Sequence, residues 1–444
     1  MRSNIVKLER GTTMDKYLKI LADDQEYEKI SAYEILMCFS SALDLISPLV
    51  AGHQIRVAYI ALKLAQEMKL DKNDTDLLVI AACIHDIGAT TVKQRNDIID
   101  PNYESDGTHE KVGYYYTNES KMFSNVSKII RHHHQDWDYS KGCIVDGEKI
   151  PEVTHILHLA DRIDTYIDKD SYILHQVDKI VNEVVEKKDS KFKPELVDVL
   201  IRLSKNEAFW LDIVSKGIES KLFKEANLPK VMLDLDGIYD ITSWFSDIID
   251  FRSRFTSVHS KGVAISAQKI GEYMGLSKKD QKILNISGYL HDLGKLAVPN
   301  KILEKNGKLD KYEFEVVRCH TYHTYYVLSR IKGLKYITKY AAYHHERIDG
   351  NGYPFHVKGR QIPIGSRIVA VADVFTAIAE DRPYRIGMTR KQIFDIMAQK
   401  GDNKALDKEI VKVFLDNFDD INDSRNRMQD YQKERYERFW SSIK

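Results

Sequence analysis

Apolar residues recur at helical spacing along most of the chain, and the alternation typical of strands is scarce. In the second half this spacing predicts helices within Ile241–Met274 and over Lys279–Leu290, Glu313–Ile331 and Ile364–Ala379. Only nine prolines are present to interrupt them. The pattern therefore predicts an all-α protein.

Several blocks of sequence occur twice. CFSSALDLISPLVAGH, which ends at His53, resembles WFSDIIDFRSRFTSVH, which ends 206 positions later at His259. At the same separation AACIHDIG matches SGYLHDLG, and further pairs follow at separations of 211 or 212: His109 with His320, His133 with His344, and Asp161 with Asp373. Because this period is far longer than a solenoid repeat, we expect two tandem helical bundles related by internal duplication.

The repeat and the linker composition set the expected domain bounds. We expect an N-terminal extension over 1–29, a first bundle over 30–205, a connecting helix and linker over 206–236, a second bundle over 237–420 and a C-terminal helix over 421–444. Within the connector, one helix should be followed by a short connection at Pro229.

Composition narrows the functional classes. The 66 basic and 66 acidic residues cancel, so no bulk attraction to DNA or to an anionic membrane is indicated. The apolar runs, such as Leu77–Ile84, are far shorter than the ~20 residues needed to span a bilayer, and the N-terminus shows no apolar signal core. We therefore expect a cytoplasmic protein. The four cysteines form no CxxC pair, which argues against a thiolate zinc site.

Histidines cluster beside aspartates in the second bundle. A single histidine on an apolar face is usually a packing residue, but here a whole set recurs in the other bundle. Asp373 is notable because it lies in the apolar run RIVAVADVFTAI, where a carboxylate is costly unless it is paired or bound to a metal. The candidate metal ligands are His259, His291, Asp292, His320, His344, His345 and Asp373.

Imidazole and carboxylate ligands without thiolates favour a transition ion over calcium. Seven ligands exceed the needs of one ion, so we expect two divalent ions, with Fe or Mn favoured and Ni, Co or Zn as alternatives. Two ions bridged by a carboxylate and a water would activate that water for attack on a phosphoester. Phosphoester hydrolysis is the expected reaction.

The second bundle also carries a specific motif. His291-Asp292-Leu293-Gly294-Lys295, HHERIDGNGYP over His344–Pro354 and IPIGSRIVAVADVFTAIAEDRPYR over Ile362–Arg385 resemble the HD-GYP subgroup of the HD phosphohydrolase superfamily. The resemblance implies hydrolysis of cyclic di-GMP to pGpG or GMP, with 3′,3′-cyclic GMP-AMP as the alternative substrate. It also implies that His259, His291, Asp292 and Asp373 hold one ion and that His320, His344 and His345 hold the other, with Asp292 bridging.

Other residues of the motif are candidates for substrate contacts. Lys295 would act with Asp292 at the scissile phosphate, and Arg382 and Arg385 would contact phosphate or guanine. Gly352, Tyr353 and Pro354 would shape a tight loop near the site. Some members of the subgroup place a Glu four residues before the first His, but this position is Phe255 here. We therefore expect two ions and not three.

The first bundle keeps the ligands but not the substrate residues. Its aligned candidates for a second metal site are His53, His85, Asp86, His109, His133, His134 and Asp161. Ala89 stands in place of Lys295, Asp170 stands in place of Arg382, and the GYP loop is replaced. Three hypotheses remain open for this bundle: a second hydrolase that acts on the linear product or another nucleotide phosphate, a metal-bound regulatory domain, and a structural pseudo-enzyme.

One alternative lies outside the enzymes. A cyclic dinucleotide sensor would bind without hydrolysis and signal through the first bundle, although a sensor needs neither an activated water nor Lys295. A homodimer is left open as the assembly.

Overall fold

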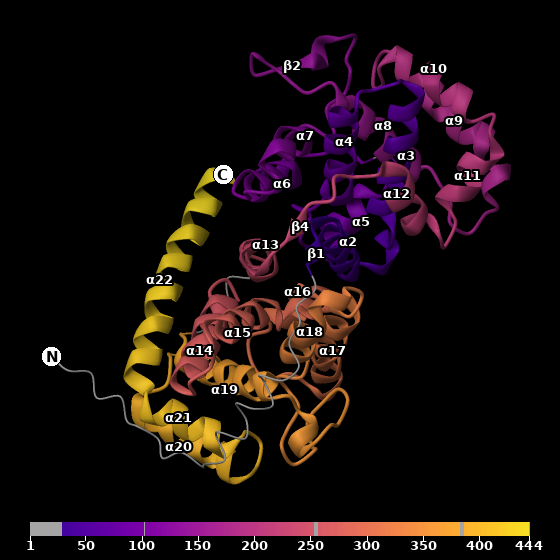
Figure 1. Cartoon of the computed structure of the whole chain (residues 1–444). Helices are drawn as coiled ribbons and strands as arrows, with labels where there is room; N and C mark the ends of the chain where they lie inside the picture. The colour runs from indigo at the N-terminus through magenta and orange to yellow at the C-terminus, as the bar shows by residue number, and fades with distance from the viewer. Residues whose placement is uncertain (1–28, 102, 253–255, 382–385, 444) are drawn as a thin grey trace. The chain divides into compact units, whose positions relative to one another are not determined.

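The computed structural model describes residues 29–101, 103–252, 256–381 and 386–443. In this part of the chain nearly all regular structure is helical, and the four strands are two residues long. The predicted all-α class is thereby confirmed. Two compact units are present: an N-terminal unit, Ser31–Met232 with the last residues from Arg438, and a C-terminal unit, Leu233–Glu437 (Figure 1).

The elements of the N-terminal unit are short helices joined by tight turns. In chain order they are β1 (Ile30–Ser31), α2 (Ala32–Leu43), η1 (Asp44–Ile46), η2 (Pro48–Val50), α3 (His53–Glu67), α4 (Lys72–Ile84), α5 (Val92–Ile98), α6 (Thr108–Asn118), η3 (Ser124–Val126), α7 (Ser127–Arg131), η4 (Lys141–Cys143), β2 (Ile144–Val145), β3 (Glu148–Lys149), α8 (Val153–Thr165), η5 (Ile173–His175), α9 (Val177–Val185), α10 (Pro194–Leu203), α11 (Glu207–Ile213), α12 (Ile218–Ala226) and β4 (Met232–Leu233). β2 and β3 form an antiparallel hairpin, and β1 pairs with β4.

The C-terminal unit follows with longer helices. They are α13 (Leu235–Asp250), α14 (His259–Tyr273), α15 (Lys278–Leu290), η6 (Leu293–Ala297), α16 (Asn300–Leu303), α17 (Lys311–Leu328), η7 (Lys332–Leu334), α18 (Lys335–Ala342), η8 (Gly359–Gln361), α19 (Ile364–Ala379), α20 (Arg390–Asp402), α21 (Lys408–Asp416) and α22 (Phe418–Ile443). Three of the predicted helical stretches correspond closely to α15, α17 and α19, and the stretch Ile241–Met274 contains parts of two helices, α13 and α14.

The same three-helix arrangement occurs in both units. α3 packs against α4 and α8, and α14 packs against α15 and α19. The helix starts also correspond, because Asp71 accepts a hydrogen bond from the Asp74 amide at the start of α4, and Ser277 accepts one from the Asp280 amide at the start of α15. Such side-chain caps satisfy amides that lack a partner within the helix. The duplicated sequence thus forms duplicated packing.

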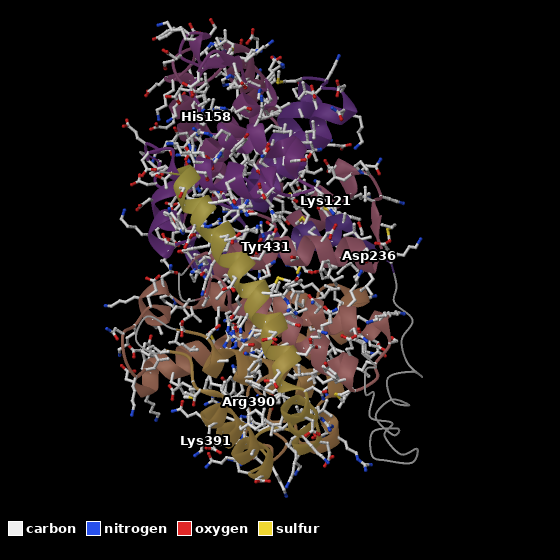
Figure 2. All side chains as sticks on the ribbon, turned by 90° about the vertical axis from the view of Figure 1, so that its left-hand side faces the viewer. Lys121, His158, Asp236, Arg390, Lys391 and Tyr431 are labelled. Atoms are coloured by element: carbon white, nitrogen blue, oxygen red, sulfur yellow. The ribbon has the colours of Figure 1, made fainter. Side chains whose placement is uncertain are left out.

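The connecting segment differs from the predicted single helix, whereas a C-terminal helix is present as predicted. The stretch before Pro229 forms two helices, α11 and α12, because the chain turns at Ser215–Gly217, where the Gly217 amide donates to the Ser215 hydroxyl. Both helices contact α3, and Trp210 of α11 is fully buried. The last helix, α22, buries Gln429 and Gln432, whereas Tyr431 is 55% exposed (Figure 2).

No helix in the described part of the chain is long and apolar enough to cross a membrane.

Candidate metal centres

The C-terminal unit brings the predicted metal ligands together from five places in the chain. They lie at the start of α14 (His259), just after α15 (His291 and Asp292), within α17 (His320), just after α18 (His344 and His345) and within α19 (Asp373). Three overlapping groups have ligand atoms within 4.8 Å of one another: His259, His291 and Asp373; His291, Asp292 and His344; and His320, His344 and His345. Helix packing therefore creates one continuous cluster.

Asp292 lies in the middle of this cluster. Its Oδ2 is 3.1 Å from Nε2 of His291 and 3.8 Å from Nε2 of His259, and its Oδ1 is 3.5 Å from Nε2 of His320. The two oxygens thus face different imidazoles. This is the arrangement that a carboxylate shared between two ions requires.

Backbone carbonyls orient three of the imidazoles. The Nδ1 atoms of His291, His320 and His344 lie 2.7, 2.6 and 2.6 Å from carbonyl oxygens three residues earlier. A proton on Nδ1 can be donated to that carbonyl, which leaves Nε2 as the basic atom inside the cluster. Ligating histidines are commonly held in this tautomer by such an outer hydrogen bond.

Burial keeps most of these imidazoles neutral. It lowers the pKa of His320 to about 3 and holds the pKa of His344 well below its usual value. His259 differs, because the carboxylates of Glu380 and Asp373 outweigh the effect of burial and raise its pKa to about 10. A neutral imidazole is the form that binds a metal, so the buried set suits metal ions.

Buried polar atoms that form no hydrogen bond are the strongest indication that these clusters bind a ligand. Among the described residues, Nε2 of His291 in the C-terminal unit forms no hydrogen bond. The same holds in the N-terminal unit for both carboxylate oxygens of Asp86 and for Nε2 of His53, His85 and His134. Leaving such atoms unsatisfied costs about 1–3 kcal/mol each. The residues present therefore fit divalent metal ions in both units.

Each unit also contains an outer carboxylate that the sequence analysis missed. Nδ1 of His259 lies 3.1 and 3.3 Å from the two oxygens of Glu380, and Nδ1 of His53 lies 2.7 Å from Oδ2 of Asp164. Asp164 follows the predicted ligand Asp161 by three residues, and Glu380 follows Asp373 by seven. The available signal was a second acid one or two turns further along, within the same apolar helix for Asp164 and directly after its end for Glu380.

Two glycines allow the close approach of the His-Asp turns to a neighbouring helix. A Cβ atom on Gly294 would lie 1.9 Å from the carbonyl oxygen of His320, and one on Gly88 would lie 2.0 Å from that of His109. Real Cβ atoms do not make such contacts with backbone. The glycine two residues after each His-Asp pair is therefore required to bring Asp292 and His320, or Asp86 and His109, into one cluster.

The structure describes some of the predicted substrate-binding residues. Nζ of Lys295 lies 2.5 Å from Oδ2 of Asp292, and the lysine side chain is 22% exposed. The ring of Tyr353, which precedes a cis bond to Pro354, has its centre 4.9 Å from that of His345. Gly352 is buried, and a Cβ there would lie 2.4 Å from the Arg347 amide nitrogen.

Three residues of the sequence analysis, Phe255, Arg382 and Arg385, lie outside the described residues.

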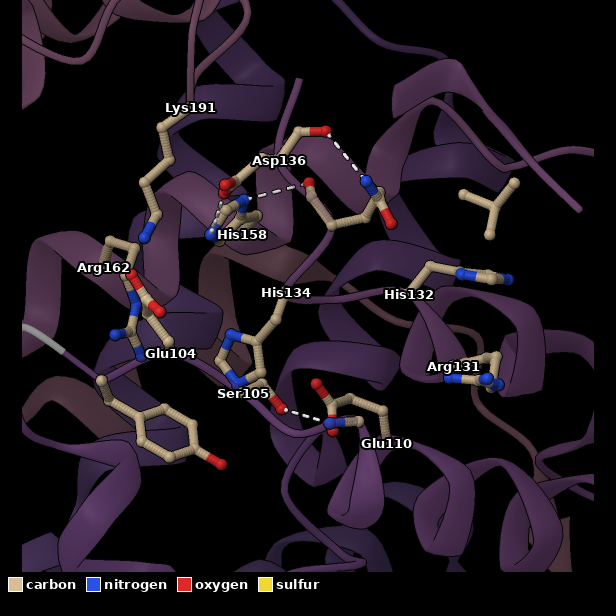
Figure 3. A pocket seen from close by; sticks show the side chains of 14 residues that line it. Glu104, Ser105, Glu110, Arg131, His132, His134, Asp136, His158, Arg162 and Lys191 are labelled. Carbon is tan, nitrogen blue, oxygen red and sulfur yellow. Dashed lines mark hydrogen bonds and ion pairs between the residues drawn. The ribbon is translucent and has the colours of Figure 1, made fainter. Parts of the chain in front are cut away.

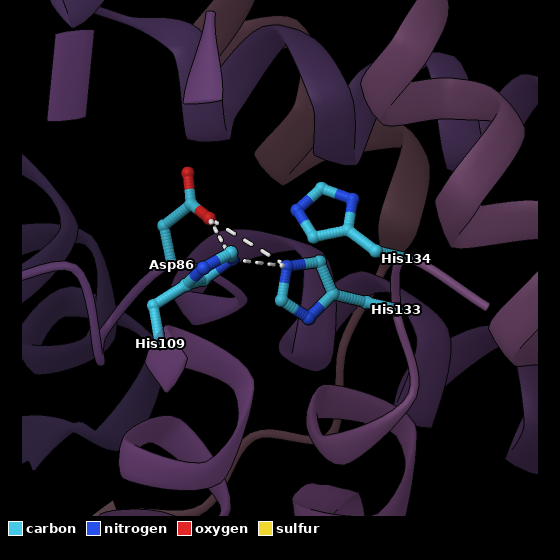
Figure 4. A group of neighbouring side chains, drawn as sticks. All are labelled: Asp86, His109, His133 and His134. Atoms are coloured by element: carbon cyan, nitrogen blue, oxygen red, sulfur yellow. Dashed lines mark hydrogen bonds and ion pairs between the residues drawn. The ribbon is translucent and has the colours of Figure 1, made fainter. Parts of the chain in front are cut away.

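The N-terminal unit assembles the matching cluster. Ligand atoms of Asp86, His109, His133 and His134 lie within 4.8 Å of one another (Figure 4). Those of His53, His85 and Asp86 also lie within 4.8 Å of one another. Asp161 completes the set, with Oδ1 3.2 Å from Nε2 of His53. All seven aligned residues are therefore brought together.

A cavity of about 440 Å³ opens beside this second cluster (Figure 3). His134 and Glu110 line it next to the cluster, and Arg131, Arg162 and Lys191 also line it. Arg162 is buried and binds Asp161, with its Nη2 2.7 Å from Oδ2. At the aligned positions, Ala89 stands in place of Lys295 and Asp170 in place of Arg382, so the sequence alone predicts that the substrate-handling cations are lost. The structure instead places cations from other positions at this cavity.

Comparisons with known proteins agree with this architecture. Residues 50–166 and residues 243–410 each match the HD domain family. The chain carries two HD domains in tandem.

The chain is similar to curated relatives from bacteria. It is 28% identical to 3′3′-cGAMP-specific phosphodiesterase 1 of Vibrio cholerae over 87% of this chain and 92% of the relative. It is 33% identical to 3′3′-cGAMP-specific phosphodiesterase 3 of the same organism over 59% of this chain and 56% of the relative. A cyclic di-GMP phosphodiesterase of Thermotoga maritima is 34% identical over 44% of this chain and 53% of the relative.

One solved structure, a cyclic GMP-AMP specific phosphodiesterase of V. cholerae, superposes with a TM-score of 0.62. That match covers 90% of this chain and 98% of the other, at 22% identity, and it supports the fold.

Proposed function

We propose that this protein is a metal-dependent phosphodiesterase whose C-terminal unit hydrolyses a cyclic dinucleotide. The observation that carries the proposal is the buried cluster around Asp292, with Lys295 beside it at the partly exposed edge. The names of the relatives support the same class of substrate. The relative matched over 92% of its length acts on 3′,3′-cyclic GMP-AMP, so this dinucleotide stands beside cyclic di-GMP as a substrate to test.

Two divalent transition ions, with Fe or Mn favoured, fit the ligand set. His259, His291, Asp292 and Asp373 would hold one, and His320, His344 and His345 would hold the other. Asp292 is suited to bridge them because its two oxygens face different imidazoles. Bound ions would supply an activated water and neutralise charge on the phosphate.

The protein residues would supply position and charge. Lys295 is held against Asp292 and can donate a proton or hydrogen bond to the oxygen that leaves the phosphorus. Glu380 would keep the Nδ1–H of His259 pointing away from the cluster, so that its Nε2 stays inside. The backbone contacts of His291, His320 and His344 would prevent rotation of these imidazoles.

A second activity is favoured by the cavity of the N-terminal unit. Its cluster is complete, and Arg131 and Lys191 line the cavity beside it, where they could bind phosphate charge. We propose that this site acts on a nucleotide phosphate, with the linear product of the first reaction as the candidate.

The decisive experiment uses the full chain purified without oxygen. Bound metal is measured, and cyclic di-GMP and 3′,3′-cyclic GMP-AMP are followed by chromatography. Asp292→Ala should abolish cleavage of both cyclic substrates, and retention of the wild-type rate would refute the assignment of the C-terminal unit. Asp86→Ala should leave ring opening intact and make the linear product accumulate. An unchanged product profile and metal content would refute a catalytic N-terminal unit.

A further inference from the structure

Helix α17 carries aromatic side chains on its outer face around a single arginine. Phe314, Tyr322 and Tyr326 are 48%, 49% and 57% exposed. Arg318 lies between Phe314 and Tyr322 at intervals of four residues, so all four share one face of the helix. The same helix carries His320 into the metal cluster. Arg318 therefore lies on the same helix as a predicted metal ligand, two residues before it.

The guanidinium of Arg318 lies near two aromatic rings. Its Cζ lies 4.7 Å from the centre of the Tyr353 ring and 5.9 Å from that of Phe314. The Tyr353 ring centre is in turn 4.9 Å from that of His345, a predicted metal ligand. Only one aromatic ring thus separates the guanidinium from the ligand cluster.

The Tyr353 ring, which packs against Arg318, is held in position by its loop. The loop that carries it is held by Glu346, which is buried and accepts a hydrogen bond of 2.7 Å from the Phe355 amide.

The N–H groups at the edge of the Arg318 guanidinium can bind a ligand. Aromatic contacts engage the faces of a guanidinium, whereas its N–H groups point outward in its plane. Among the residues that the structure describes, Arg318 forms no ion pair. A planar fork of N–H donors matches the O6 and N7 acceptors of guanine, and adenine cannot accept both hydrogen bonds because N6 is a donor.

We propose that Arg318, stacked on Tyr353, reads the guanine of the cyclic dinucleotide and so determines base specificity. The inference rests on the proposed function of the C-terminal unit and adds a specificity residue to it. Both candidate substrates contain guanine, so the role of Arg318 does not depend on which one is preferred.

The test measures both binding and cleavage. Wild type, Arg318→Met and Arg318→Lys are compared with Arg330→Met, which removes an exposed arginine just beyond the end of α17. Dissociation constants and KM are measured for cyclic di-GMP, 3′,3′-cyclic GMP-AMP and cyclic di-AMP. Arg318→Met should weaken binding of the guanine dinucleotides about tenfold or more and lower their preference over cyclic di-AMP. Arg318→Lys should not restore that preference, because an ammonium lacks the fork.

Different outcomes separate this inference from the proposed function. An equal loss for cyclic di-AMP would mean a phosphate contact and would overturn the inference, as would full restoration by Lys or no loss at all. If wild type bound guanine dinucleotides without cleaving them, the proposed function would fail, and the binding ratios would still decide the role of Arg318. If wild type neither bound nor cleaved them, both would fail.

Discussion

Glu380 offers a sensitive test of how the C-terminal cluster is held. Its carboxylate accepts from Nδ1 of His259 at 3.1 and 3.3 Å and from Nε2 of Gln429 at 3.2 Å. Arg425 donates to Oε1 of Gln429, which keeps the amide of Gln429 from turning over. In Glu380→Gln, one oxygen becomes an NH₂ group that must face another donor.

The size of the effect follows from these contacts. A hydrogen bond to a charged group contributes about 1.5–3 kcal/mol, which corresponds to about tenfold to 150-fold in a dissociation constant. Loss of an outer carboxylate on a ligating histidine commonly costs about tenfold to a hundredfold in metal affinity or activity. We therefore expect Glu380→Gln to weaken metal binding in the C-terminal unit by at least about tenfold, without unfolding the protein.

The assay is chelator competition in an Asp86→Ala background, so that only the C-terminal cluster is measured. Asp164→Asn, which removes the corresponding charge beside His53, serves as the matched control in the other unit. In a chain whose metal clusters are both intact, Asp164→Asn should weaken metal binding only at the N-terminal site. An affinity of Glu380→Gln within twofold of the parent would refute the positioning role of this carboxylate.

Three further predictions follow from the same geometry. Lys295→Met should lower kcat for the dinucleotide by about a hundredfold while metal content is kept, because the lysine binds Asp292 but is not a ligand; loss of metal would contradict this. Gly294→Ala should destabilise the protein by about 1–3 kcal/mol, seen in chemical denaturation, because its Cβ would collide with the His320 carbonyl; an unchanged midpoint would be inconsistent with the packing. Removing bound metal with a chelator should lower the Tm, and adding metal back should restore it, because ions bind the folded state; a Tm independent of metal would argue against both sites.

The sequence pattern carried information about the fold and the ligands for different reasons. Helical periodicity and the near absence of alternation identify α15, α17 and α19, because each helix buries one continuous apolar face. The duplicated blocks identify the ligand sets, because the same His and Asp residues recur at matching positions. Asp373 illustrates this: a charge inside an apolar helix already signals a buried partner.

Contacts between segments that are far apart in the chain could not be predicted from the sequence pattern. Glu380 reaches His259 across 121 positions, and Asp164 reaches His53 across 111, from places that do not align in the duplication. Arg162 and Lys191 likewise line the N-terminal cavity, although neither aligns with Lys295 in the duplicated sequence. Each of these partnerships depends on how helices pack, and a side chain can reach the same point from several positions along a helix.

The sequence by itself determined the helical class, the duplication and the two sets of seven metal-ligand candidates, because periodicity, repetition and residue chemistry are local properties. Only the tertiary structure decided which carboxylates orient the histidines, which cations face the N-terminal cavity, and that Arg318 stacks on Tyr353 beside the cluster. The reason is physical: hydrogen bonds and ring contacts depend on distances of a few ångströms, and such distances are set by packing between segments far apart in the chain.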